Sequence, residues 1–221
     1  MTPRKEGRMP SVFGYEVDEA ITSPEQLRQH YKMPSRYVSD KVIDHIDPLA
    51  ERFLAATSLV FLSTRRADGQ INLSPRGDPA GFLHVLSPRL LALPDRMGNN
   101  RTDAFEDILR DPQVGLICVI PGHRDTLRIS GEARLVRDAS LCETLSVQGK
   151  PAQSALLIKV NRVLCHCPKA FVRGGVWDAD GWPARETIPT LAEMMVAHGA
   201  LSDSVAEMDA IVKRDGETRL Y

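Results

Sequence analysis

Residues 90–109 read LLALPDRMGNNRTDAFEDIL, and they predict an apolar strand, a polar loop and then an amphipathic helix. The strand is expected over residues 90–94. The helix is expected over about 102–110, where Asp111-Pro112 ends it. Two arginines, two asparagines and a glycine lie in the loop between them. One short helix inserted among strands with tight turns favours an antiparallel barrel over a parallel α/β sheet.

The loop before this helix is a candidate anion site. A helix start leaves N–H groups unpaired and carries about half a positive charge, so anions bind there readily. Arg101 adds a forked donor that suits a phosphate. The alternative is an ordinary helix start, in which Thr102 or Asn100 caps the helix and Arg101 pairs with Asp95 or Asp103. Spacing alone leaves both interpretations open.

Strand patterns occupy most of the chain on either side of this stretch. Residues 57–77 predict a hairpin with Asp68-Gly69 as its turn, and further strands are expected over 81–87, 113–120, 125–138 and 155–167. Gly131, in the middle of one strand, suggests a bulge or a barrel corner. Helices are expected over 23–31, 138–147, 190–199 and 202–214, and over 39–57 with a break or restart at Pro48.

The bulk composition is that of an ordinary soluble protein. The chain has 221 residues, 43% hydrophobic and 26% charged, and 28 basic against 29 acidic residues give a net charge of −1. This balance gives no general attraction to nucleic acid or to an anionic membrane. No apolar run approaches the roughly 20 residues that span a bilayer, and MTPRKEGRMP lacks the apolar core of a signal peptide. We therefore expect a cytoplasmic protein without nucleic-acid or membrane partners.

Two patterns that resemble metal sites have simpler explanations. Cys165 and Cys167 point to one side of a strand and His166 to the other, and the sequence holds no second Cys/His pair with zinc-like spacing. Residues 178–181 resemble part of a calcium loop, but the twelfth position is Pro189 instead of glutamate. We expect no metal site, and the four cysteines do not predict a disulfide framework.

Several motifs in order resemble the pyridoxamine 5′-phosphate oxidase-like family of flavoproteins. They are SPRG at 74–77, LPDRMGNNRTD at 93–103, DPQVGLI at 111–117, TLRISG at 126–131, and HCPKA at 166–170 followed by Arg173 and Trp177. The resemblance covers about residues 54–177 and rests on the ordered set, not on any single motif. It implies a mainly β fold with α-helices: a six-stranded type of antiparallel split β-barrel, the FMN-binding fold, with N- and C-terminal helices.

The resemblance implies an FMN cofactor, held mainly by its phosphate where the barrel-crossing helix begins. By position, Arg76 matches the basic residue that ends the second strand, and Asn100 and Arg101 match the turn that grips the phosphate. Thr126 stands where the family often has a side chain against the flavin ring. The complete set of expected cofactor-binding residues is Ser74, Arg76, Asn99, Asn100, Arg101, Thr126, Lys169, Arg173 and Trp177.

The resemblance also implies a homodimer with each FMN at the subunit interface. Lys169, Arg173 and Trp177 are then candidates for contacts made from the partner chain. Trp177 fits a hydrophobic anchor for the following segment equally well, and Arg128 fits a surface charge better than a flavin contact. We expect an N-terminal arm with helices over residues 1–53, the FMN-binding barrel over 54–177, and a helical extension over 178–221 packed on the same domain.

The implied function is that of an FMN-dependent oxidoreductase with an unidentified small-molecule substrate and NAD(P)H as one candidate electron donor. True pyridoxamine phosphate oxidases grip their substrate with an Arg/His pair that cannot be matched after Trp177, which argues against vitamin B6 oxidation. No side chain stands out as a general base, so catalytic residues stay unassigned. The alternatives are a non-catalytic FMN carrier or sensor, a deazaflavin-binding protein, and a haem-binding protein with His84, His123 or His166 as its ligand.

Overall fold

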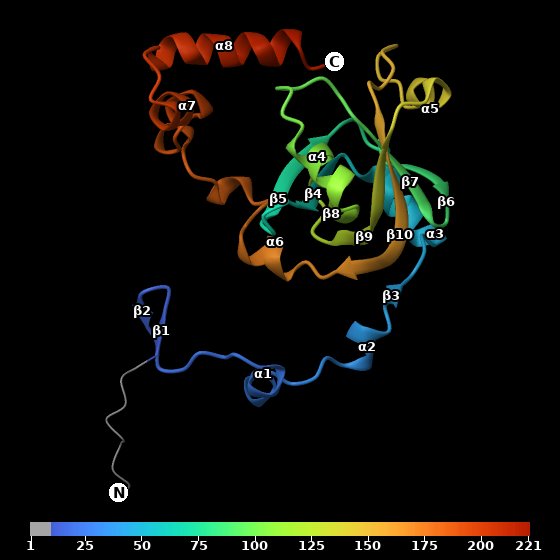
Figure 1. Ribbon diagram of the computed structural model, residues 1–221, viewed down its shortest axis with the longest axis vertical. Coiled ribbons are helices and arrows are strands. Elements are labelled where there is room, and N and C mark those ends of the chain that lie inside the picture. Colours follow the sequence, from blue (N-terminus) through green and yellow to red (C-terminus); the bar gives the residue numbers. More distant parts are fainter. Residues whose placement is uncertain (1–9) are drawn as a thin grey trace, which may run out of the picture. The chain divides into compact units, whose positions relative to one another are not determined.

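The structure, a computed structural model, describes residues 10–221 and divides the chain into two compact units between residues 40 and 41 (Figure 1). In the first unit, β1 (Ser11–Val12) and β2 (Tyr15–Glu16) form an antiparallel hairpin, and α1 (Pro24–His30) and α2 (Arg36–Ser39) follow. Ser23 caps α1 by accepting a hydrogen bond from the Gln26 N–H, as the sequence predicts. Residues 1–9 of the expected N-terminal arm lie outside the described residues.

The second unit is built on one antiparallel sheet. Its strands are β3 (Val42–Ile43), β4 (Leu59–Arg65), β5 (Ile71–Gly77), β6 (His84–Ser87), β7 (Leu90–Pro94), β8 (Gln113–Val119), β9 (Thr126–Val136) and β10 (Ala155–His166). They pair in the order β5-β4-β8-β9-β10-β7-β6, and β3 pairs with β10. The split-barrel fold expected from the sequence is confirmed, and short marginal strands extend the six-stranded pattern to eight.

The longest pair of strands changes register at Gly131. Opposite this residue β10 contains a bulge, in which Asn161 is the extra residue. A Cβ built on Gly131 would lie 2.0 Å from the carbonyl oxygen of Lys159, far inside van der Waals contact. Because only glycine leaves room for the backbone of β10, the predicted bulge is confirmed and its cause is a close approach of two main chains.

Residues 39–57 do not form one interrupted helix. Val42 and Ile43 form β3, and α3 (Pro48–Ala56) begins separately, where Asp47 accepts a hydrogen bond from the Ala50 N–H at 2.8 Å. The predicted helical segment at Val42 and Ile43 is therefore wrong. These residues pair with the far end of β10, a tertiary contact that their apolar spacing does not encode.

One apolar core fills the inner side of the sheet. Leu54 of α3 and Leu62 of β4 are completely buried in it. Helix α4 (Asp103–Arg110) packs against β4, β5 and β9 and adds Ala104 and Ile108 to the same core. A smaller cluster joins α5 (Ala139–Thr144) to the start of β10. Since burying one large aliphatic side chain is worth about 1.5–3 kcal/mol, this core fixes α4 against the sheet.

Beyond β10 the chain is helical. It forms α6 (Lys169–Arg173), short 3-10 turns at Ala179–Gly181 and Arg185–Thr187, α7 (Leu191–Gly199) and α8 (Val205–Thr218). Helices α7 and α8 contact each other and each begins with a capping box, which confirms the two predicted helices. None of the helices in residues 10–221 combines the length and apolar character that crossing a bilayer requires.

Replacing Gly131 with Ala should destabilise the protein by about 2 kcal/mol or more, because overpacking a closed site costs about 1–3 kcal/mol. Urea unfolding followed by circular dichroism measures the effect. Gly115→Ala on neighbouring β8 is the matched control, since a Cβ there would make only an ordinary contact, 3.8 Å from Ser63 Cβ. Equal stability of the two variants would contradict the close approach at Gly131.

Candidate ligand-binding site

A cavity of about 540 Å³ lies between β5 and the loop that leads from β7 into α4. Its walls include residues 72–78, the loop residues 96–99 and 101, and the first two residues of α4. Small-molecule sites in proteins have volumes of about 300–1,000 Å³. Four of the nine residues expected to bind a cofactor line this one cavity: Ser74, Arg76, Asn99 and Arg101.

The β5 wall of the cavity is polar because the sequence of β5 alternates. Its exposed side carries Ile71, Leu73 and Pro75, and its half-buried side carries Asn72, Ser74, Arg76 and, directly after the strand, Asp78. Burying these polar side chains against apolar groups would leave them without hydrogen bonds, which is unfavourable. The side of β5 that faces the cavity is therefore suited to polar contacts.

Arg76 lies in the middle of this polar wall and is incompletely paired. Its Nη1 is 3.5 Å from Asp95 Oδ1, and its guanidinium lies over the Phe105 ring of α4, 5.2 Å from the centroid. Burial lowers the pKa of Arg76 and raises that of Asp95, and each charge partly offsets the shift of the other. Arg76, near the end of β5, therefore lies beside α4.

Two buried polar atoms in the same wall lack partners. Ser74 Oγ and Arg76 Nε are inaccessible to solvent and make no hydrogen bond within residues 10–221. Leaving such a group unpaired costs about 1–3 kcal/mol, so buried polar atoms in proteins are nearly always bonded. Both atoms belong to residues that line the cavity, so the cavity wall holds hydrogen-bonding capacity that no described residue uses.

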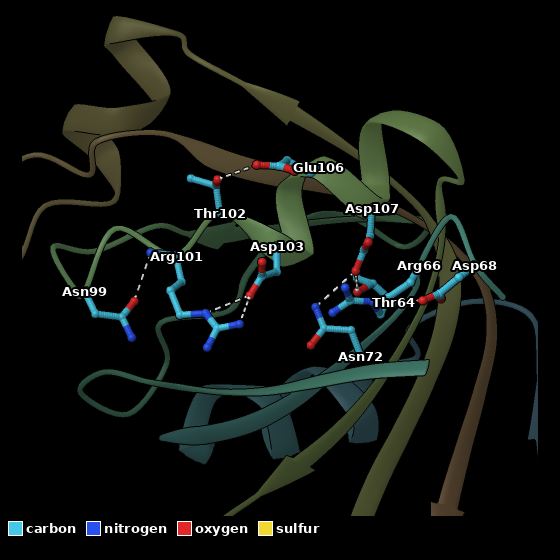
Figure 2. A network of polar contacts seen from close by, with 10 residues as sticks. All are labelled: Thr64, Arg66, Asp68, Asn72, Asn99, Arg101, Thr102, Asp103, Glu106 and Asp107. Carbon is cyan, nitrogen blue, oxygen red and sulfur yellow. Dashed lines mark hydrogen bonds and ion pairs between the residues drawn. The ribbon is translucent and has the colours of Figure 1, made fainter. Parts of the chain in front are cut away.

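The asparagines of the loop shape its backbone (Figure 2). Asn99 Oδ1 accepts a hydrogen bond from the Arg101 N–H at 3.0 Å, and Asn100 has a φ of 60°, in the left-handed region that asparagine tolerates. Thr102 precedes α4, but its hydroxyl donates to Glu106 Oε1 at 2.9 Å and caps no N–H group. Of the ordinary helix start that the sequence left open, the capping by Thr102 or Asn100 is therefore wrong, and the start of α4 has no side-chain cap.

Arg101 pairs with Asp103, the first residue of α4 (Figure 2). Its Nε and Nη2 lie 2.9 Å and 2.7 Å from Asp103 Oδ2. The Arg101 side chain is 72% exposed and that of Asp103 is 42% exposed. Since an exposed pair contributes only about 0–1 kcal/mol, Arg101 can exchange the carboxylate for a ligand anion at small cost.

A buried carboxylate, which sequence reasoning missed, holds α4 in place. Asp107 is 4% exposed and accepts hydrogen bonds from Thr64 Oγ1 of β4 at 2.8 Å and from Asn72 Nδ2 of β5 at 3.0 Å (Figure 2). The signal in the sequence is an acidic residue on the face of the helix that carries Ala104 and Ile108, where an apolar residue is expected.

Arg96 and Asp78 form a second unpredicted contact at the cavity wall. Arg96 Nε donates to Asp78 Oδ2 at 2.6 Å, and Arg96 Nη2 donates to the Leu145 carbonyl at 2.6 Å. The Asp78 side chain is 1% exposed. These bonds tie the beginning of the loop to the end of β5 and to the segment after α5.

The other expected residues do not line this cavity in the single chain. They are Asn100, Thr126, Lys169, Arg173 and Trp177. Thr126 is buried at the start of β9, and Lys169 and Arg173 lie at the two ends of α6. Trp177 Nε1 donates to the His123 carbonyl at 2.7 Å, which makes Trp177 an anchor for the segment after β10. Cofactor contacts of these residues stay predictions.

The chain is therefore an antiparallel split barrel with a polar cavity where β7 leads into α4, a short helix whose start has no side-chain cap. The family described as Pyridoxamine 5′-phosphate oxidase matches residues 46–167, more than half of the chain. The chain belongs to this family, and the identification made from its motifs is confirmed. Its members usually bind a flavin and are typically dimeric.

Solved structures with a similar barrel include HupZ of Group A Streptococcus, with 14% identity over 54% of this chain and 93% of that chain, at a TM-score of 0.44. General Stress Protein 26 of Bacillus anthracis is 17% identical over 53% of this chain and 90% of that chain, at a TM-score of 0.40. An F420 reductase is 15% identical over 51% of this chain and 94% of that chain, also at a TM-score of 0.40. No curated protein is similar enough in sequence to count as a match.

Asp107→Ala should destabilise the protein by about 2–4 kcal/mol, because hydrogen bonds to a charged group are worth about 1.5–3 kcal/mol and two buried donors lose their partner. Urea unfolding measures this. Glu106→Ala, one position earlier on the exposed side of α4, is the control and should change stability by less than about 0.5–1 kcal/mol. A loss of stability as large in Glu106→Ala would show that Asp107 has no special role.

Proposed function

We propose that this protein is an FMN-dependent oxidoreductase acting on a small molecule, with the FMN phosphate bound between β5 and the start of α4. The observation that carries the proposal is the pair of unpartnered buried atoms, Ser74 Oγ and Arg76 Nε, in the wall of a cavity that Arg101 also lines. All three are donors, and a phosphate offers several acceptor oxygens at once. Asn99 and Asn100 contribute by holding the shape of the loop.

The start of α4 supports an anion at the same place. Thr102 caps none of its N–H groups, and Asp103 and Ala104 both line the cavity. Backbone N–H groups at an uncapped helix start favour phosphate through hydrogen bonds and the helix dipole. In this proposal the phosphate takes the place of the Asp103 carboxylate at Arg101, and Asp103 turns toward solvent.

When bound, the flavin supplies the redox chemistry, accepting or donating a pair of electrons as hydride. The chain contributes binding and orientation. The Ser74 hydroxyl, the two arginines and the helix N–H groups hold the phosphate, and the Asp107 clamp fixes the helix that presents them. The substrate and its electron donor, with NAD(P)H as one candidate, are not specified by these residues.

The proposal includes a cytoplasmic homodimer with FMN at the subunit interface. In it, Thr126 would contact the flavin ring, and Lys169, Arg173 and Trp177 would help to hold the FMN of the other subunit. Their placement away from the cavity of their own chain is compatible with contacts made across an interface. Sedimentation of the flavin-loaded protein tests the dimer.

The absorption spectrum of the purified protein tests the cofactor. A flavin spectrum, restored by titrating stripped protein with FMN, supports the proposal. A Soret band indicates haem, and uptake of deazaflavin but not FMN indicates the deazaflavin alternative. Histidine, cysteine and tyrosine are absent from the described residues that line the cavity, and Met97 is the one residue among them of a type that ligates haem iron. Flavin reduction by NAD(P)H then separates an oxidoreductase from a carrier or sensor.

Arg101→Ala should lose FMN while remaining folded, because the exposed side chain contributes little to stability and a charged hydrogen bond to phosphate is worth about 1.5–3 kcal/mol, about 10- to 150-fold in affinity. Fluorescence titration with FMN measures the loss. Arg110→Ala, at the other end of α4, is the control and should bind FMN normally. Full flavin occupancy in Arg101→Ala would contradict the phosphate assignment.

Asp103→Asn should bind FMN about three- to tenfold more tightly, because it removes the carboxylate that competes for Arg101 and repels the phosphate. The same fluorescence titration measures the affinity for FMN. Raising the salt concentration should reduce the difference in affinity between Asp103→Asn and the wild-type protein. Asp209→Asn on the exposed surface of α8 changes the net charge equally and serves as the control. Unchanged or weaker binding in Asp103→Asn would exclude exchange of the Asp103 carboxylate for the phosphate.

A further inference from the structure

Residues 219–221, here called the latch segment, return from the end of α8 to the cavity loop. Arg219 Nη2 donates to the Gly98 carbonyl at 3.3 Å, and Tyr221 Oη donates to Asp78 Oδ1 at 2.9 Å. Lys150 Nζ donates to the Tyr221 carbonyl at 2.8 Å. Figure 1 shows this end of the chain beside the loop between β7 and α4. The segment lies outside the family match, which ends at residue 167.

The cavity loop has few other attachments. Residues 97–100 are exposed, and the bond from Arg219 to Gly98 is the one hydrogen bond, within residues 10–221, that joins them to a distant element. The Asn99 bond to Arg101 is local. A segment with exposed backbone and few external bonds opens easily. The latch segment therefore supplies a large share of what holds this loop in place.

The second attachment passes through the buried Asp78 carboxylate. One of its oxygens accepts from Tyr221 and the other from Arg96, which begins the loop and lines the cavity. Burial, with the Asp78 carboxylate as a smaller cause, raises the pKa of Tyr221. The hydroxyl is protonated at neutral pH in any case, because the ordinary pKa of tyrosine is about 10, and it therefore donates to Asp78. Asp78 thus joins the latch segment to the cavity wall.

A smaller cavity of about 290 Å³ separates the latch segment from the back of the loop. Arg96 and Met97 line both cavities, and Lys150 and Tyr221 line the smaller one. The loop is therefore a thin wall, with the ligand cavity on one side and the latch segment on the other. A movement of the latch segment changes the support behind the residues that face the ligand.

We propose that the latch segment holds loop 96–101 closed over the cavity and sets how fast an anionic ligand leaves. The proposal rests on the proposed function for the identity of that ligand, FMN. Arg219 and Tyr221 are positioning residues, because they contact the loop and Asp78 and make no contact with the cavity itself. Ligand release then requires the segment to detach first.

Two rates test whether the latch segment holds the loop: amide hydrogen exchange in the loop and dissociation of bound FMN. In Tyr221→Phe and in Arg219→Ala, exchange of the Arg101 amide, a loop N–H that is hydrogen-bonded to Asn99 Oδ1, should be about three- to tenfold faster in the ligand-free protein, the equivalent of one hydrogen bond. The rate at which bound FMN dissociates should rise by a similar factor. Arg219→Lys retains a donor and should recover part of the effect, whereas Arg214→Ala, an exposed arginine on α8, should change neither rate.

Unchanged loop exchange in both variants would overturn the proposal, and so would faster exchange without faster FMN release. The exchange measurement needs no ligand. A failure of the proposed function would appear separately, as absence of FMN binding to the wild-type protein, and the exchange rates would still decide whether the segment holds the loop.

Discussion

The site depends on one buried interaction, the hydrogen bonds that the Asp107 carboxylate accepts from Thr64 and Asn72. They join α4 to two adjacent strands, while Ala104 and Ile108 fix the same helix in the apolar core. A buried carboxylate without partners would be strongly unfavourable, so the helix can lie in only one position on the sheet. That position places the start of α4 opposite the polar side of β5, and the cavity is the space left between them.

Opposite charges are arranged in pairs around this space. Arg76 faces Asp95, Arg96 faces Asp78 and Arg101 faces Asp103, and burial decides what each pair can do. The buried Arg96–Asp78 pair is structural, because separating it would leave a desolvated carboxylate. The exposed Arg101–Asp103 pair is weak and exchangeable. The Arg76–Asp95 pair is intermediate in burial, and it leaves Arg76 Nε without a hydrogen bond. The three arginines therefore do not make the cavity freely cationic, because each of them is paired with an aspartate. Only the Arg101–Asp103 pair is weak enough for a ligand anion to replace the carboxylate.

Short sequence patterns predicted much of the fold and part of the candidate site. The hairpin over residues 57–77, its Asp68-Gly69 turn and the bulge at the mid-strand Gly131 each reflect the conformational preference of a few neighbouring residues, and the structure confirms all three. Of the nine residues expected to bind a cofactor, four line one cavity. Asp107 was missed because one acidic residue on an apolar helix face gives no indication of its partners, which come from strands 35 and 43 residues away.

By itself, the sequence determined the succession of the main strands along the chain, the turns, the family and the loop that carries Arg101, because backbone preference and hydrophobic periodicity act over short distances. Only the tertiary structure decided which aspartate each arginine faces, that residues 42 and 43 pair with β10, and that Thr102 leaves α4 uncapped. It also decided that Arg219 and Tyr221 meet residues 121 and 143 positions away. Such contacts depend on where packing brings distant segments together, and no local pattern records that.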